Sequence, residues 1–138
     1  MVICNGREEN ILLRLTNGEE IGTTFPPTAS KMESRKRWML GGLSNKGGIV
    51  VDQGAATALG EQNRSLLPAG VQHVEGEFQR GDIVYILGPE GKKVGCGIAN
   101  YGSEDTARIK GSRSDRIQGI LGYHYGQEVV HRSNLVLL

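Results

Sequence analysis

The densest basic run in the sequence lies immediately before its single tryptophan. Residues 35–37 are all cationic and precede Trp38, in a chain of 138 residues whose formal net charge is only +1. A cluster of cations can neutralise phosphates, and an aromatic ring can stack on a nucleobase, so this pattern could contact RNA. Further cations could join the cluster in the folded chain. The candidate RNA or interdomain contacts are Arg35, Lys36, Arg37, Lys46 and Arg64.

The same run also has a purely structural interpretation. Trp38 begins an apolar stretch, 38–40, which we expect to form a short strand with Trp38 in the core. The cations would then be a solvated linker edge or a contact with a neighbouring domain. The small net charge excludes a general attraction to nucleic acid or membranes, so any binding needs a local patch. We therefore expect RNA binding to be weak and membrane binding to be absent.

Two carboxylates and a glycine loop are the other groups that could do chemistry. Asp52 and Asp82 could form an acid–base pair, but Asp52 is a natural helix N-cap and Asp82 belongs to a Gly-Asp turn. The segment 88–93 superficially resembles a phosphate loop. Only two residues separate its glycines, and a strand rather than a helix follows, so we predict a hairpin turn. We predict no catalytic residue.

The cysteines and histidines do not indicate a metal site. Cys4 and Cys96 have no short-range partner, and we expect both to be buried structural thiols in a reducing cytoplasm. The three histidines lack the close spacing of metal ligands. For His131 we expect a structural hydrogen bond to the rest of the fold. We predict neither a metal nor a cofactor for this chain.

The first 25 residues look like the end of a larger unit. An apolar strand signal begins at Val2, and Asn10 is placed to cap a short apolar helix that stops at Gly18. Such a short helix is not stable alone in water, so it needs a sheet to pack on. Prolines and small polar residues predict a linker over 26–34. A second unit is then expected over 35–138.

The second unit alternates short apolar runs with turns. The chain has 21 glycines, about twice the usual share of ~7%. Strands are predicted at 38–40, 49–51, 66–74, 83–87, 94–99 and 135–138, and helices at 52–60, 103–110 and 114–121, with Ser103 and Ser114 as caps. Gly95 and Gly97 share a face that lets a neighbouring backbone approach closely. This mainly β (α+β) pattern indicates a small curled sheet, closed or nearly so, although periodicity alone does not distinguish a sandwich from a barrel.

Seven short motifs occur in a fixed order along the chain: Ser34–Trp38, Gly48–Ala56, Ser65–Leu67, Gly70–Val71, Gly81–Asp82, Val130–Arg132 and Asn134–Val136. Together they resemble the C-terminal PUA domain of the glutamate 5-kinase family, and the stretch 18–23 is similar to the end of that family's amino-acid-kinase domain. The resemblance implies a PUA-type mixed-strand pseudobarrel with short helices over 35–138, preceded by a stub of an α/β kinase domain over 1–25. The family usually has Asp where Ser133 stands.

The resemblance implies an accessory, regulatory role in a larger enzyme. Members of the family use ATP and Mg²⁺ to convert L-glutamate to L-glutamate 5-phosphate, the first step of proline biosynthesis, in the cytoplasm. Their catalytic elements lie upstream of the region matched here, so this chain is not expected to be an enzyme. The expected partners are the upstream kinase domain and, in an oligomer, a second copy. A free-standing RNA-binding PUA module and a protein-interaction module for assembly remain as alternatives.

Overall fold

The computed structural model describes residues 1–26, 31–41 and 47–138, and the side chains of residues 31–33, 35 and 36 are outside that description. The chain divides into two compact units, Met1–Ser34 and Arg35–Leu138. Within the described residues, no helix is long and apolar enough to cross a membrane.

The first unit is a small strand pair with one short helix. Strand β1 (Val2–Ile3) pairs antiparallel with β2 (Thr23–Thr24), and α1 (Ile11–Thr16) lies between them in the sequence. Asn10 does precede the helix, but it has a left-handed backbone and makes no side-chain capping bond, so its predicted cap is wrong. Ile11 is buried, whereas Leu12 and Leu13 are exposed. The unit therefore carries apolar helix surface that its own residues do not cover.

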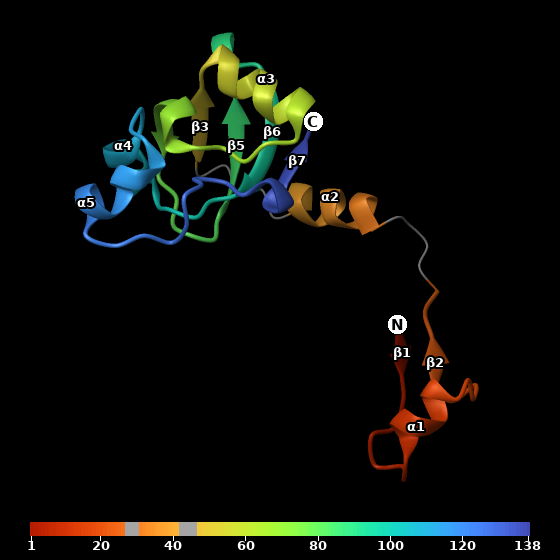
Figure 1. Ribbon diagram of the computed structural model, residues 1–138. Coiled ribbons are helices and arrows are strands. Elements are labelled where there is room, and N and C mark those ends of the chain that lie inside the picture. The colour runs from red at the N-terminus through yellow and green to blue at the C-terminus, as the bar shows by residue number, and fades with distance from the viewer. Residues whose placement is uncertain (27–30, 42–46) are drawn as a thin grey trace. The chain divides into compact units, whose positions relative to one another are not determined.

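The second unit is built on a five-stranded sheet (Figure 1). The strands run in the order β4-β3-β5-β6-β7, where β3–β5 is a parallel pair and the other neighbours are antiparallel. An isolated bridge between Leu66 and Val130 adds a further connection outside these strands. The predicted mainly β, α+β fold is confirmed. The strands are β3 (Gly47–Val51), β4 (Val71–Gly76), β5 (Ile83–Leu87), β6 (Lys93–Ile98) and β7 (Leu135–Leu137).

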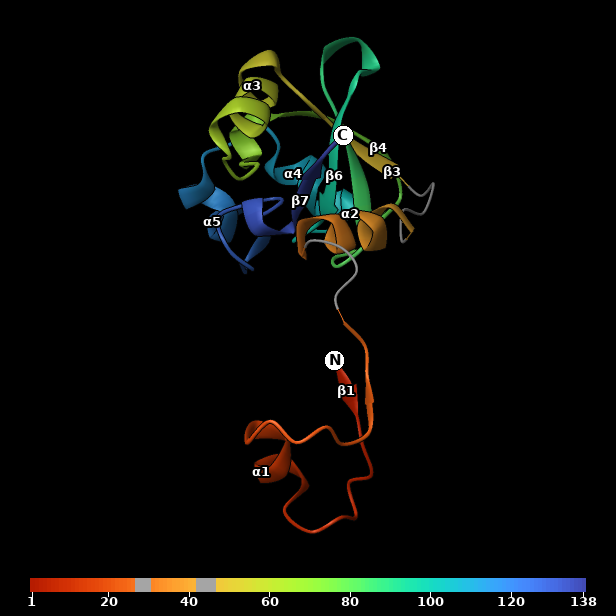
Figure 2. The ribbon, with the colours of Figure 1, turned by 90° about the vertical axis from the view of Figure 1, so that its right-hand side faces the viewer.

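Short helices complete the fold, and Figure 2 shows α3 and α5 on the same side of the sheet. Asp52 caps α3 as predicted, because its side chain accepts a hydrogen bond from the Ala55 N–H at 2.7 Å. The α-helices are α2 (Lys31–Gly41), α3 (Gln53–Gln62), α4 (Ser103–Ile109) and α5 (Ile117–Leu121). The 3₁₀ turns are η1 (Pro68–Gly70), η2 (Pro89–Gly91), η3 (Ser114–Arg116) and η4 (Arg132–Asn134).

The prediction of a core strand at 38–40 is wrong. This stretch is the end of helix α2, where Met39 is fully buried and Trp38 is 62% exposed. Met39 packs in a cluster with Ile83, Cys96 and Val136. Successive residues on a helix point about 100° apart, so burying Met39 turns Trp38 outward. A short apolar run does not by itself distinguish a strand from a helix. In this helix the residue that packs into the core is Met39, not Trp38.

Four boundary predictions also need correction. Helix α3 continues through Gly60 to Gln62, and its C-cap residue Asn63 takes the left-handed conformation. The expected strand 66–74 begins only at Val71, because Pro68 opens the 3₁₀ turn η1. The predicted serine caps are absent: Gly102 is the N-cap of α4, and Ser114 lies inside η3.

The glycine face of β6 is confirmed as a site of close backbone approach. A side chain at Gly95 would place its Cβ 2.5 Å from the Val136 carbonyl oxygen of β7. At Gly97 a Cβ would lie 2.5 Å from a Val130 methyl and 2.9 Å from the Asn134 carbonyl oxygen. These two glycines let the C-terminal segment pack directly on β6. The contact at Gly97 allows Val130, which precedes β7, to pack in the hydrophobic core with residues such as Ile49 and Ile86.

Candidate functional site

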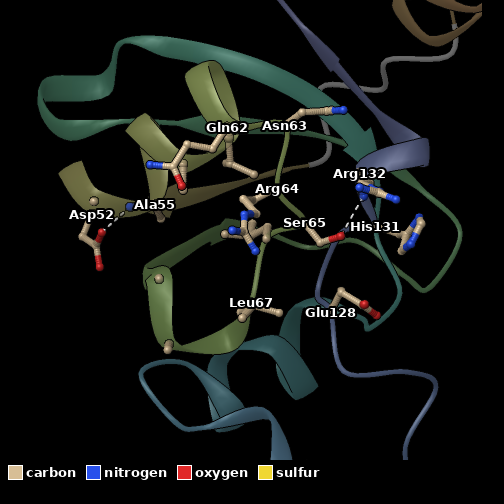
Figure 3. Close-up of a pocket in the computed structure, with 16 residues that line it drawn as sticks. Asp52, Ala55, Gln62, Asn63, Arg64, Ser65, Leu67, Glu128, His131 and Arg132 are labelled. Carbon is tan, nitrogen blue, oxygen red and sulfur yellow. Dashed lines mark hydrogen bonds between the residues drawn. The ribbon is translucent and has the colours of Figure 1, made fainter.

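The candidate functional site is a pocket beside α3 with a volume of about 720 Å³ (Figure 3). It combines the helix, the segment that follows it, η1, and residues that precede β7. Its apolar side includes Leu59 and Leu66, both buried in the core. The lining residues with polar or charged side chains are Asp52, Gln62, Asn63, Arg64, Ser65, Glu128, His131 and Arg132.

The N-terminal end of α3 is held against η1. The Asp52 N–H donates to the Gly70 carbonyl oxygen at 3.0 Å, while the Asp52 carboxylate caps the helix. Gly70 packs closely under the helix, since a Cβ there would lie 2.5 Å from the Ala55 Cβ. A glycine at position 70 is therefore required by space rather than by backbone conformation.

The segment after α3 is joined to the segment before β7. The Leu66 N–H donates to the Val130 carbonyl oxygen, and the Val129 N–H donates to the Leu66 carbonyl oxygen, both at 2.8 Å. The Arg132 N–H donates to Ser65 Oγ at 3.0 Å, as the dashed line in Figure 3 shows. These bonds place Arg64 and Arg132 on neighbouring backbones at one pocket, although 67 residues separate Ser65 from Arg132 in the sequence.

Buried Tyr101 fixes the loop that leads to Glu128. Its hydroxyl donates to the Gly126 carbonyl oxygen and accepts from the Tyr125 N–H. Asn100 adds a hydrogen bond from its side-chain amide to the Glu128 carbonyl oxygen at 3.0 Å. Burial raises the pKa of the Tyr101 phenol above its ordinary value, so this group stays neutral and able to donate up to a higher pH than an exposed tyrosine.

His131 makes its hydrogen bond within its own turn. Its Nδ1 accepts from the Ser133 N–H at 3.2 Å and lies 2.6 Å from Ser133 Oγ. The prediction that His131 makes a structural hydrogen bond is correct, but its expected partner is wrong. The partner is Ser133 in η4, the adjacent turn, and not another part of the fold. Because Nδ1 accepts the backbone hydrogen, the neutral ring carries its proton on Nε2. Ser133, at the position where the resembling family usually has Asp, is part of this arrangement.

Of the two predicted contact cations whose side chains the structure describes, Arg37 and Arg64, the pocket is lined by Arg64. Arg37 is exposed on α2. The side chains of Arg35 and Lys36 and the whole of Lys46 lie outside the described residues. The proposed cluster of these cations therefore stays a prediction.

Sequence reasoning missed Glu128 and Arg132 as pocket residues. Arg132 belongs to a motif that carried the family resemblance, which was the available signal, but its distance in sequence from Ser65 concealed the contact.

The family model for the PUA domain matches residues 47–121 of this chain, which is more than half of it. The chain belongs to the PUA domain family. This range contains α3, η1 and strands β3 to β6. The expected PUA fold is thus confirmed, and the pocket is formed by the matched PUA region together with residues 128–132 that follow it.

Almost the whole chain is also homologous to the C-terminal region of glutamate 5-kinases. It is 49% identical over 136 residues to "Glutamate 5-kinase" from Herpetosiphon aurantiacus, covering 99% of this chain and 37% of the relative. It is 50% identical over 137 residues to the same-named protein of Dehalococcoides mccartyi strain CBDB1, with the same two coverages. The chain thus spans little more than a third of the length of these relatives.

Similar solved structures include a PUA domain from Aeropyrum pernix K1 crystallised as a tartrate complex. That protein is 32% identical with a TM-score of 0.46, and the match covers 62% of this chain and 41% of the other.

Motifs that carried the resemblance meet at the pocket. Asp52 caps α3 and bonds to Gly70, and Ser65 accepts from the Arg132 N–H. Segments far apart in the sequence therefore share one location. Some of the motifs that carry the family resemblance therefore contain residues that line this pocket.

Proposed function

We propose that this chain is the accessory, regulatory PUA domain of a glutamate 5-kinase. The observation that carries the proposal is that the homology covers 99% of the chain at 49% identity, including the first unit, which lies outside the range matched by the PUA family model. An independent PUA module would not need a preceding segment that also resembles a glutamate 5-kinase. The free-standing RNA-binding alternative is therefore not favoured, and RNA is proposed only as a weak partner.

In this proposal the chemistry belongs to the upstream kinase domain. That domain would use ATP and Mg²⁺ to phosphorylate L-glutamate, opening proline biosynthesis in the cytoplasm, where ATP is available. Phosphoryl transfer needs a phosphate cradle and metal ligands. In residues 1–26, 31–41 and 47–138, no three His, Cys, Asp or Glu residues gather into a metal-binding group. The segment 88–93 forms the turn η2 and the start of β6 rather than opening a helix.

The same homology supports the domain organisation that we propose. Residues 1–25 are the end of the amino-acid-kinase domain, 26–34 are the linker, and 35–138 are the PUA domain. The short helix α1, with Leu12 and Leu13 exposed, fits this role because an apolar helix face packs on a larger sheet. The kinase domain is thus the first partner we propose, and a second copy of the parent chain is another.

The coding sequence upstream of the Met1 codon tests the parentage. We expect an uninterrupted reading frame that encodes an amino-acid-kinase domain, so that the native polypeptide is much longer than 138 residues. Immunoblotting of a lysate from the source cells with an antibody to residues 47–138 should detect the longer species. An in-frame stop codon directly upstream, together with a native protein of 14.9 kDa, would contradict the proposal.

A further inference from the structure

The pocket beside α3 has the charge arrangement of a site for a small zwitterion. Its ionised lining residues are two guanidinium groups, Arg64 and Arg132, and two carboxylates, Asp52 and Glu128. In the view of Figure 3, Arg64 lies between Asp52 on one side and the Ser65–Arg132 contact on the other. A volume of about 720 Å³ falls within the range of small-molecule pockets, which is roughly 300–1,000 Å³.

The two guanidinium groups are available to a ligand. Arg132 forms hydrogen bonds through its backbone: its N–H donates to Ser65 Oγ, and its carbonyl oxygen accepts from the Leu135 N–H. Neither the Arg132 nor the Arg64 side chain forms a salt bridge with another described residue. Both side chains are exposed at the pocket. A guanidinium group presents paired N–H donors that match the two oxygens of a carboxylate. Two such groups on adjacent backbones therefore favour a carboxylate.

Glu128 supplies the opposite charge. Its backbone is held by Asn100 and by the Val129–Leu66 hydrogen bond, but its carboxylate forms no hydrogen bond or ion pair with a described side chain. A polyanion such as RNA would bring its phosphates against this carboxylate and that of Asp52, and like charges at an interface are unfavourable. A ligand that carries both an ammonium group and a carboxylate would be complementary to the whole lining.

We propose that this pocket binds a free α-amino acid, whose carboxylate contacts Arg64 and Arg132 and whose ammonium group contacts Glu128. The inference rests on the proposed function in one respect: L-glutamate and L-proline are the natural probes, because the proposed parent enzyme consumes the first and leads to the second. An amino acid at this site would stabilise the packing of α3 against residues 128–132, and so give the PUA domain a ligand-dependent state.

Isothermal titration of the 138-residue chain tests the site without any kinase activity. We expect saturable binding of L-glutamate or L-proline at millimolar concentration or below. Arg64→Gln and Arg132→Gln should each weaken this binding about tenfold or more, because each removes charged hydrogen-bond donors. Arg116→Gln is the matched control, since Arg116 is exposed and outside the pocket, and it should bind like the wild-type chain.

Succinate and a short single-stranded RNA distinguish the zwitterion from a simple anion. Glu128→Gln should weaken amino-acid binding about tenfold but should not weaken succinate binding, because succinate has no ammonium group. The proposal would be overturned if neither amino acid binds, if succinate binds as tightly and Glu128→Gln has no effect, or if RNA occupies the site more tightly. Circular dichroism of each variant confirms that it is folded, and these results do not depend on the upstream reading frame.

Discussion

Replacing Ile86 with alanine will lower the free energy of unfolding of the second unit by about 2–5 kcal/mol. Ile86 is fully buried on β5, which pairs with β3 on one side and β6 on the other. It lies opposite Ile49 of β3 and Gly95 of β6. Neighbours paired on both sides cannot collapse freely into the space that the lost atoms leave. Chemical denaturation followed by circular dichroism measures the loss.

The matched control is Ile3→Ala, which makes the same substitution at an exposed position of the first unit. Exposed substitutions usually change stability by no more than about 0.5 kcal/mol, so the second unit should unfold as in the wild type. If Ile86→Ala costs less than about 0.5 kcal/mol, the central position of β5 in the core is wrong.

Gly70→Ala will destabilise the chain by about 1–3 kcal/mol, because a Cβ at this position would lie 2.5 Å from the Ala55 Cβ. Relief requires α3 and η1 to move apart, which also strains the hydrogen bond from the Asp52 N–H to the Gly70 carbonyl oxygen. The backbone of Gly70 is not in the left-handed region, so the expected cost is one of packing. Thermal and chemical denaturation give the change in stability.

Gly60→Ala is the control for this substitution, since Gly60 lies within α3 and has no atom near the added Cβ. Alanine favours the helix over glycine by roughly 0.5–1 kcal/mol, so this variant should be more stable than the wild type. Opposite signs for the two variants would support the packing of α3 on η1. Equal effects at both positions would show that this packing is wrong.

The sequence correctly predicted those elements that are determined by residues close together in the chain. The apolar run 83–87 became β5, and the Asp52 cap followed from a polar residue placed between a strand and a helix. The glycines of β6 were predicted to allow close approach because alternate residues share a face. Each of these predictions depended only on neighbouring residues, and the structure confirms all three.

Features that depend on distant packing were not predictable in this way. Trp38 was expected in the core, but burial of Met39 against β5, β6 and β7 sets the orientation of α2. Gly60 was expected to end α3, yet the helix continues to Gln62. In the pocket, Arg64 was identified as a cation of interest, whereas Arg132 and Glu128 were not. They are brought there by hydrogen bonds between residues far apart in the sequence, such as Ser65–Arg132 and Leu66–Val129.

The central claim is that this chain serves as the regulatory PUA domain of a glutamate 5-kinase. The most direct test is a chimera in which the chain replaces the homologous region of the Herpetosiphon aurantiacus relative, compared with that relative lacking the region. Formation of glutamyl hydroxamate from L-glutamate, ATP and hydroxylamine, measured across a range of L-proline concentrations, reports both activity and feedback. We predict that the chimera keeps the activity and proline response of the intact relative, while the truncated enzyme differs in its proline response. A folded chimera that behaves like the truncated enzyme would contradict the claim.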